Sequence, residues 1–297
     1  MQERTLGSTG ERVSAVGLGG FHIGKVERRE AVRLIRAAID GGITFLDNCW
    51  DYHKGESEVR MGHALRDGYR RRVFLMTKLD AHTKAMAAAQ LEQSLRRLQT
   101  DCIDLVQMHE VIRPGDPDAL LAAGGAIEAL VEARQAGKLR YIGFTGHKDP
   151  DVHLKMLAGD FPFDAVQMPL NCFDAHFRSF EARVLPVLVQ RGIGVLGMKP
   201  LAGGRILETG AATPEECLRY ALSLPTSVVI TGCETQAQVE QALRAGSEFR
   251  PLSADERSAL LARTAPAAAD GAWERYKTTD LHDGTKHNPH WLDSSAA

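Results

Sequence analysis

The chain of 297 residues carries a formal net charge of −2, with 44% hydrophobic and 25% charged residues, which is ordinary for a globular protein with a substantial core. It has no long run of lysine or arginine, so its sequence indicates neither nucleic-acid binding nor a polybasic membrane anchor. A small molecule is therefore the expected partner, and a monomer is compatible with the sequence.

The cysteines and the apolar segments indicate the compartment. The five cysteines are odd in number and show no Cys-x-x-Cys spacing, which favours reduced thiols over disulfides or zinc ligands. No apolar stretch is long enough to span a bilayer, and the first residues lack the apolar core of a signal peptide. We expect a cytoplasmic protein.

The first predicted element is a β-hairpin. Polar and apolar residues alternate between Arg4 and Ser14, around Gly7 and Gly10. Such a hairpin could plug one end of a barrel.

Eight short apolar runs then alternate with longer stretches of helical periodicity, a pattern typical of βα units repeated around a parallel sheet. The predicted strands are 15–19, 43–46, 73–77, 104–108, 141–144, 165–168, 194–197 and 228–231. The clearest predicted helices are 28–40, 84–98, 126–136, 182–190, 214–222 and 236–245, with glycines at 41, 42, 137 and 192 where helices should end.

This alternation predicts the architecture. Eight similar units without a linker or a break in composition favour a closed (β/α)₈ TIM barrel that forms one domain over residues 1–297. An open doubly wound sheet would show the same alternation and is the alternative.

A C-terminal extension lies outside the eight units. One more helix is predicted near 253–263, and a tail follows over about 266–297. We expect the tail to pack back on the barrel, either as surface packing or as a lid over a pocket. The residues that suggest this are its aromatics and histidines: Trp273, Tyr276, His282, His287, His290 and Trp291.

Four ionisable residues stand at or just after predicted strands. Asp47 and Tyr52 are five residues apart after the second strand, Lys78 ends the third and His109 ends the fourth. Reactive groups of such barrels gather at the carboxyl ends of the strands. Each residue alone could equally be a satisfied structural group, so it is their combination that indicates a site.

This combination resembles the aldo-keto reductase family. The resemblance extends from the hairpin through Pro200 and Leu201 to the loop at Gly232. It implies an NAD(P)-dependent oxidoreductase that interconverts a carbonyl compound and an alcohol. It also implies that Asp47, Tyr52, Lys78 and His109 form the catalytic tetrad.

The chemistry of hydride transfer to a carbonyl explains these residue types. Negative charge grows on the oxygen, so the site needs a proton donor and groups that stabilise that charge. Tyr52 is the expected acid, with its pKa lowered by the ammonium of Lys78, while Asp47 keeps Lys78 charged. His109 is expected to donate a hydrogen bond to the substrate oxygen or to relay a proton.

No glycine-rich Rossmann motif is present, because the glycines between Gly17 and Gly20 lead into no helical pattern of that type. The resemblance instead implies an extended dinucleotide across the barrel mouth. Thr145 and Gln167 would hold the carboxamide, although Gly146 replaces the amide side chain usual in the family, and Met198 would replace an aromatic ring against the nicotinamide. The expected cofactor-binding residues are Gly20, Asp47, Thr145, Gln167, Met198, Lys199, Pro200, Leu201, Gly203, Gly232, Glu234 and Gln238.

The adenosine end of the cofactor bears on the choice between NADP and NAD. Gly232 and the helix start after it suit a phosphate. Relatives that prefer NADP carry Lys or Arg here, whereas this chain has Glu234 and Gln238. A carboxylate favours a free ribose hydroxyl, so both cofactors stay open. No metal is expected.

The expected substrate pocket comprises Phe21, Trp50, His109 and Trp291. Two other functions are consistent with the barrel. One is a nucleotide-binding regulatory or redox-sensor subunit, and an intact tetrad argues against it. The other is a metal-dependent hydrolase that uses His109, His147 and a carboxylate. The sequence lacks the spacing of metal ligands, which argues against this alternative.

Overall fold

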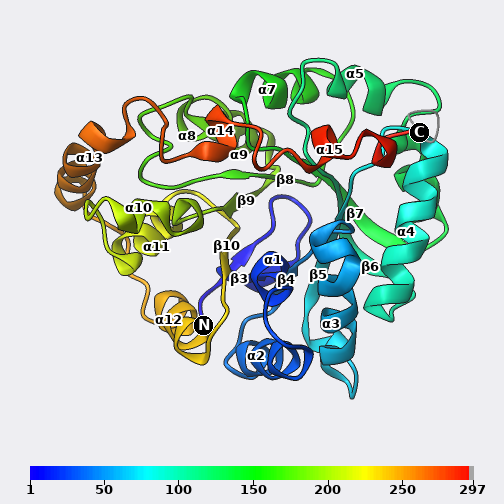
Figure 1. The fold of residues 1–297 in the computed structure, drawn as a ribbon, viewed down its shortest axis with the longest axis horizontal. Coiled ribbons are helices and arrows are strands. Elements are labelled where there is room, and N and C mark those ends of the chain that lie inside the picture. The colour runs from blue at the N-terminus through cyan, green and yellow to red at the C-terminus, as the bar shows by residue number, and fades with distance from the viewer. Residues whose placement is uncertain (294–297) are drawn as a thin grey trace.

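The computed structural model describes residues 1–293 and contains a closed barrel of eight parallel strands (Figure 1). The order around the barrel is β10-β3-β4-β5-β6-β7-β8-β9, so neighbours in the chain are neighbours in space. The strands are β3 (Val16–Gly19), β4 (Phe45–Asp47), β5 (Phe74–Leu79), β6 (Ile103–Met108), β7 (Leu139–Thr145), β8 (Ala165–Pro169), β9 (Gly194–Met198) and β10 (Val228–Gly232). The predicted TIM barrel and its eight strands are confirmed.

The helices surround this ring of strands (Figure 1). They are α1 (Gly20–Ile23), α2 (Arg28–Asp40), α3 (Glu56–Ala64), α4 (Lys84–Leu98), α5 (Asp116–Leu121), α6 (Ala126–Gln135), α7 (Pro150–Ala158), α8 (Phe180–Arg183), α9 (Leu185–Arg191), α10 (Arg205–Glu208), α11 (Pro214–Ser223), α12 (Gln236–Ser247), α13 (Ala254–Ala268), α14 (Arg275–Thr278) and α15 (Gly284–His287). Short 3₁₀ turns occur at Tyr52–Gly55, Tyr69–Arg72, Ala202–Gly204 and Pro289–Trp291.

Most predicted helices have nearly the bounds that the sequence indicated, with two differences. The helix predicted over 182–190 is divided into α8 and α9, because Pro186 lacks the N–H that a continuous helix would need. The helix predicted near 253–263 continues to Ala268, in keeping with the high helix propensity of its alanines.

Local sequence sets the ends of several helices. The side chain of Thr83 accepts a hydrogen bond from Met86 N at the start of α4, and Ser253 caps α13 in the same way through Glu256 N. At the other end of a helix, Gly192 ends α9 in the left-handed conformation, with φ of +66°. These residues therefore fix where the helices begin or end.

The hairpin of β1 (Glu3–Thr5) and β2 (Arg12–Ser14) closes one end of the barrel. Ser8 N donates to Gly192 O at 2.8 Å, just before β9 begins, so this is the end where the strands start. Leu6 is completely buried in the interior cluster with Phe45 and Leu196. The hairpin is therefore the expected plug, and the opposite end of the barrel is left for a site.

The tail folds back over the other end of the barrel. Lys277 is fully buried, and its ammonium donates to Asp174 Oδ1 at 2.6 Å and to Glu274 Oε2 at 3.0 Å. Further along, Gln90 Nε2 of α4 donates to Trp291 O at 3.0 Å. The red segment in Figure 1 accordingly runs along the rim of the barrel and ends beside α4.

None of the helices within the described residues combines the length and apolar character needed to cross a membrane. All five cysteines are free thiols, as the odd number and the spacing predicted. Their side chains therefore contribute to packing and to local polar contacts rather than to cross-links.

The plug gives a stability prediction. We expect Leu6→Ala to lower the free energy of unfolding by about 2–5 kcal/mol, because it removes a fully buried side chain from the barrel interior. Urea denaturation measures this loss. The control is Leu281→Ala, whose side chain is 64% exposed and whose loss should change stability by less than about 0.5 kcal/mol. Equal stability of the two variants would contradict the plug.

Candidate active site

A buried ion pair lies at the carboxyl ends of β4 and β5. Asp47 and Lys78 come from adjacent strands, and their side chains are 6% and 1% exposed. The Lys78 ammonium donates to Asp47 Oδ1 and, at 2.7 Å, to Asn48 O. A buried charge is costly unless it is paired, and the carboxylate of Asp47 supplies the partner of this cation.

Tyr52 lies directly over this cation. The chain turns sharply directly after Tyr52, with positive φ at His53, Lys54 and Gly55. The Lys78 ammonium lies 4.9 Å from the centre of the Tyr52 ring. Two further rings stand edge-on to that of Tyr52, namely those of Phe21 at 5.3 Å and His109 at 6.0 Å between centroids. The four predicted tetrad residues are thus brought together.

The pKa of Tyr52 differs from the expectation. Burial raises it well above its ordinary value, and the negative charge of Asp47 adds to the effect. The prediction that Lys78 lowers this pKa is wrong for the free protein, because burial, and then the charge of Asp47, disfavour the phenolate. Tyr52 is therefore a neutral phenol that can donate a proton.

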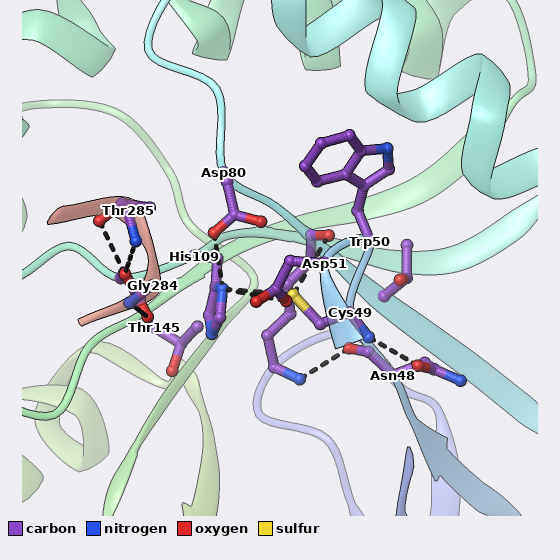
Figure 2. Close-up of polar contacts among 12 residues, drawn as sticks. Asn48, Cys49, Trp50, Asp51, Asp80, His109, Thr145, Gly284 and Thr285 are labelled. Carbon is purple, nitrogen blue, oxygen red and sulfur yellow. Dashed lines mark hydrogen bonds and ion pairs between the residues drawn. The ribbon is translucent and has the colours of Figure 1, made fainter. Parts of the chain in front are cut away.

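His109 is held by groups that the sequence did not single out. Its Nδ1 lies 2.8 Å from Asp80 Oδ1, 3.2 Å from Cys49 Sγ and 3.9 Å from Asp51 Oδ1. Figure 2 shows these side chains pointing toward the imidazole. Asp80 stands two residues after Lys78, immediately beyond β5. Its position at a strand end, like that of Lys78, could have indicated from the sequence that it is a site residue.

The electrostatics of this group favour a charged imidazole. Burial alone would lower the pKa of His109, but the negative charge of Asp80 and its hydrogen bond raise it overall. Burial, together with the charge of Asp51, raises the pKa of Asp80 to about 7. The imidazole is therefore the favoured site for a proton in this pair.

Two buried side chains at the ends of β7 and β8 suit a carboxamide. Gln167 Nε2 donates to Asp47 Oδ2 at 3.4 Å, while its Oε1 accepts no hydrogen bond from the described residues. The Thr145 hydroxyl has only a weak contact, at 4.0 Å, with Met198 Sδ. A ligand amide could satisfy both groups, so these residues fit the nicotinamide that the sequence led us to expect.

The loop after β9 offers a cation for a phosphate. Lys199 has a φ of +55°, and its ammonium lies 5.4 Å above the Tyr276 ring. Burial, and then the nearby charge of Lys78, lower the pKa of Lys199 to about 8. Pro200 and Leu201 continue the loop to Gly203, where an added side-chain carbon would meet no described atom within 4 Å. This loop fits an anionic group.

The segment after β10 differs from the expectation. Glu234 Oε1 lies 2.9 Å from the ammonium of Lys25 and 2.6 Å from Nδ1 of His22. Gln238 Oε1 accepts from the backbone N–H groups of Glu234 and Thr235 at 2.7 and 3.1 Å, as part of the cap of α12. The carboxylate of Glu234 is therefore already paired, so its charge no longer favours NAD over NADP.

Two glycines predicted to contact cofactor are needed for packing. A side-chain carbon at Gly232 would lie 2.0 Å from the His22 ring, and one at Gly20 would lie 2.8 Å from Asp47 O. Ser57 Oγ also donates to Gly20 O at 2.7 Å. The absence of a side chain thus lets α1 approach β4 and β10 closely.

The residues predicted for the substrate pocket lie on two sides of the mouth. Phe21 is 45% exposed beside Tyr52. Trp50 meets Trp291 of the tail edge-on, at 5.6 Å between ring centroids, and donates from Nε1 to Gln93 Oε1 at 2.8 Å. The tail therefore supplies one aromatic ring next to the loop that carries Tyr52.

The tail is fixed to the site by Glu110, which the sequence did not single out. This residue follows His109 with a φ of +47°, and its carboxylate accepts from Gly284 N at 2.8 Å and Thr285 N at 2.7 Å. His147 also binds the tail, through Asp283 at 3.3 Å, and burial lowers its pKa to about 4. His147 therefore does not join His109 in the way that the hydrolase alternative required.

Comparison with known proteins adds a family match. The family model described as "Aldo/keto reductase family" matches residues 15–216. The aldo-keto reductase YhdN of Bacillus subtilis is 33% identical over 231 residues, which cover 72% of this chain and 66% of that protein. The L-galactose dehydrogenase of Arabidopsis thaliana is 30% identical over 293 residues, which cover 85% of this chain and 90% of that protein.

The fold comparison agrees. The structure of the aldo-keto reductase AKR11C1 from Bacillus halodurans, in its holo form, superposes with a TM-score of 0.75 and 24% sequence identity. The match covers 93% of this chain and 99% of that protein. At this identity the likeness supports the fold.

The raised pKa of Tyr52 can be tested by titration of the phenol absorbance. We expect the spectrum of the wild type minus that of Tyr52→Phe to show no phenolate below about pH 10, since burial and Asp47 disfavour the charged form. A phenolate signal near neutral pH that disappears in Tyr52→Phe would contradict this account.

Proposed function

The chain belongs to the aldo/keto reductase family, and we propose that it is an NAD(P)-dependent oxidoreductase that interconverts an aldehyde or ketone with the corresponding alcohol. The observation that carries the proposal is the position of Tyr52, a neutral phenol above the buried Lys78 ammonium. A proton donor backed by a fixed cation is what a carbonyl oxygen needs as it gains negative charge.

Residues at the barrel mouth would hold the cofactor. Gln167 and Thr145 would bind the carboxamide, Met198 would pack beside the ring, and Lys199 would contact a phosphate. A bound reduced nicotinamide would supply the hydride for reduction. Because Lys25 offsets the charge of Glu234, the proposal covers both NADP and NAD.

Tyr52 would deliver the proton to the substrate oxygen. The phenolate left behind would face the Lys78 ammonium, which stabilises it, and Asp47 would hold Lys78 in position throughout. In the direction of oxidation the same phenolate would accept the proton from the alcohol. One group therefore serves as acid or base according to direction.

His109 would orient the substrate. With Asp80 held at Nδ1, the other ring nitrogen is left to donate a hydrogen bond to the carbonyl oxygen. Phe21 and the pair of Trp50 and Trp291 would enclose the rest of the substrate with aromatic surface. Because Trp291 belongs to the tail, the substrate would contact both the loop after β4 and the C-terminal segment.

The acid role predicts the outcome of one substitution. Tyr52→Phe should lower kcat/KM for carbonyl reduction by about 10²–10⁴-fold and leave the dissociation constant of the cofactor unchanged, because only the proton donor is lost. Tyr69→Phe is the control, since its hydroxyl lies on the surface, where it donates to Asp40 Oδ2 at 3.1 Å. Undiminished turnover in Tyr52→Phe would contradict the proposal. Turnover of NAD(P)H by the wild type distinguishes an enzyme from a regulatory subunit.

The lowered pKa of Lys199 predicts a pH dependence of cofactor binding. Deprotonation of Lys199 above about pH 8 removes the positive charge, so wild-type affinity for NADH should fall through that pH. Lys199→Met should bind about tenfold more weakly at pH 7, with a flat profile from pH 7 to 9. Fluorescence titration measures both, with the surface variant Lys84→Met as control. Parallel profiles in Lys199→Met and the wild type would refute this role.

A further inference from the structure

Four side chains with metal-binding atoms meet at one edge of the site. Cys49 and Asp51 lie in the loop after β4, Asp80 follows β5 and His109 follows β6. One ligand atom from each of them lies within 4.8 Å of the other three. The sequence did not reveal this group because three separate strand ends contribute to it.

We propose that these four residues bind a divalent cation of the zinc class. Sulfur, imidazole nitrogen and carboxylate oxygen are the donors that such borderline-soft cations prefer. Tetrahedral coordination at ordinary zinc bond lengths separates its ligand atoms by roughly 3.3–3.6 Å. The distances from His109 Nδ1 to Asp80, Cys49 and Asp51, which are 2.8, 3.2 and 3.9 Å, bracket that range.

Unpartnered oxygens provide an independent indication. Oδ2 of Asp80 and Oδ1 of Asp51 are both buried and accept no hydrogen bond within the described part of the chain. The Asp80 side chain is wholly inaccessible to bulk solvent. Buried carboxylate oxygens without a hydrogen-bond donor destabilise the folded protein. A dication between them would satisfy both.

The neighbouring charges leave the group anionic. A nearby cation, the Lys78 ammonium, is already bound to Asp47 and to Asn48 O. Glu110, the next acid along, is occupied by the backbone N–H groups of Gly284 and Thr285. Two carboxylates and a thiol therefore face one imidazole, and a second positive charge would balance them.

The group lies at the edge of the buried region. Cys49 and Asp80 are completely buried, whereas the side chains of His109 and Asp51 are 11% and 16% exposed. Two of the four residues are therefore partly accessible to solvent. Binding would displace the thiol proton of Cys49 and the proton at Nδ1 into solvent. The cation would replace the hydrogen bond between Asp80 and Nδ1. The proposed hydride transfer does not require the cation.

Cobalt titration of the full chain tests the site without any assay of activity. The wild type should bind one Co²⁺ with a sulfur-to-cobalt charge-transfer band in the near ultraviolet. Cys49→Ser should lose that band, while Cys102→Ser, which removes a more accessible thiol outside the group, should keep it. Asp80→Asn should weaken Co²⁺ binding by about tenfold or more. Circular dichroism checks that each variant is folded.

A crystal soaked in Cd²⁺ gives the second measurement and needs no variant. The proposal predicts an anomalous peak within bonding distance of His109 Nδ1 and Cys49 Sγ. It is overturned by a soaked crystal that shows no peak there, by a charge-transfer band that persists in Cys49→Ser, or by unchanged affinity in a folded Asp80→Asn variant.

Discussion

A lysine buried at the mouth of the barrel requires a buried carboxylate, and the pair of Lys78 and Asp47 meets that requirement. The pairing depends on the parallel register of β4 and β5, which brings their carboxyl ends side by side. Asp47 has a second effect, since its charge helps to raise the pKa of Tyr52. The ion pair therefore places the cation beneath the Tyr52 ring and adds to the effect of burial, which keeps the phenol neutral.

The two ends of the barrel are closed by segments outside its eight units. At one end, Leu6 of the hairpin fills the interior, and at the other the tail is fixed by Lys277 and by Glu110. Glu110 follows His109 directly, so the carboxylate that holds the tail is adjacent to a proposed catalytic residue. The position of Trp291 next to Trp50 depends on the same attachment. The tail and the site are thus parts of one arrangement.

The sequence predicted the barrel well because eight apolar runs with helical stretches between them have few other solutions. It also identified Asp47, Tyr52, Lys78 and His109, which share strand-end positions. It could not show that Glu234 pairs with Lys25 across the chain or that Gln238 caps its own helix. The direction of the Tyr52 pKa shift was mispredicted for a similar reason, because the burial of the phenol and the charges around it depend on neighbours that are distant in the sequence. The sequence did not predict the group of possible metal ligands around His109, because its members are spread over three loops.

The central claim is that Lys78 and Tyr52 support hydride transfer to a carbonyl carbon. The most direct measurement follows deuterium from C4-deuterated NADH or NADPH into the alcohol product of aldehydes and ketones, with the wild type and with Lys78→Met. The account predicts deuterium in the product of the wild type and a large loss of transfer in Lys78→Met, with the cofactor still bound. Absence of transfer by the wild type across the substrate panel, or equal transfer by both proteins, would contradict it.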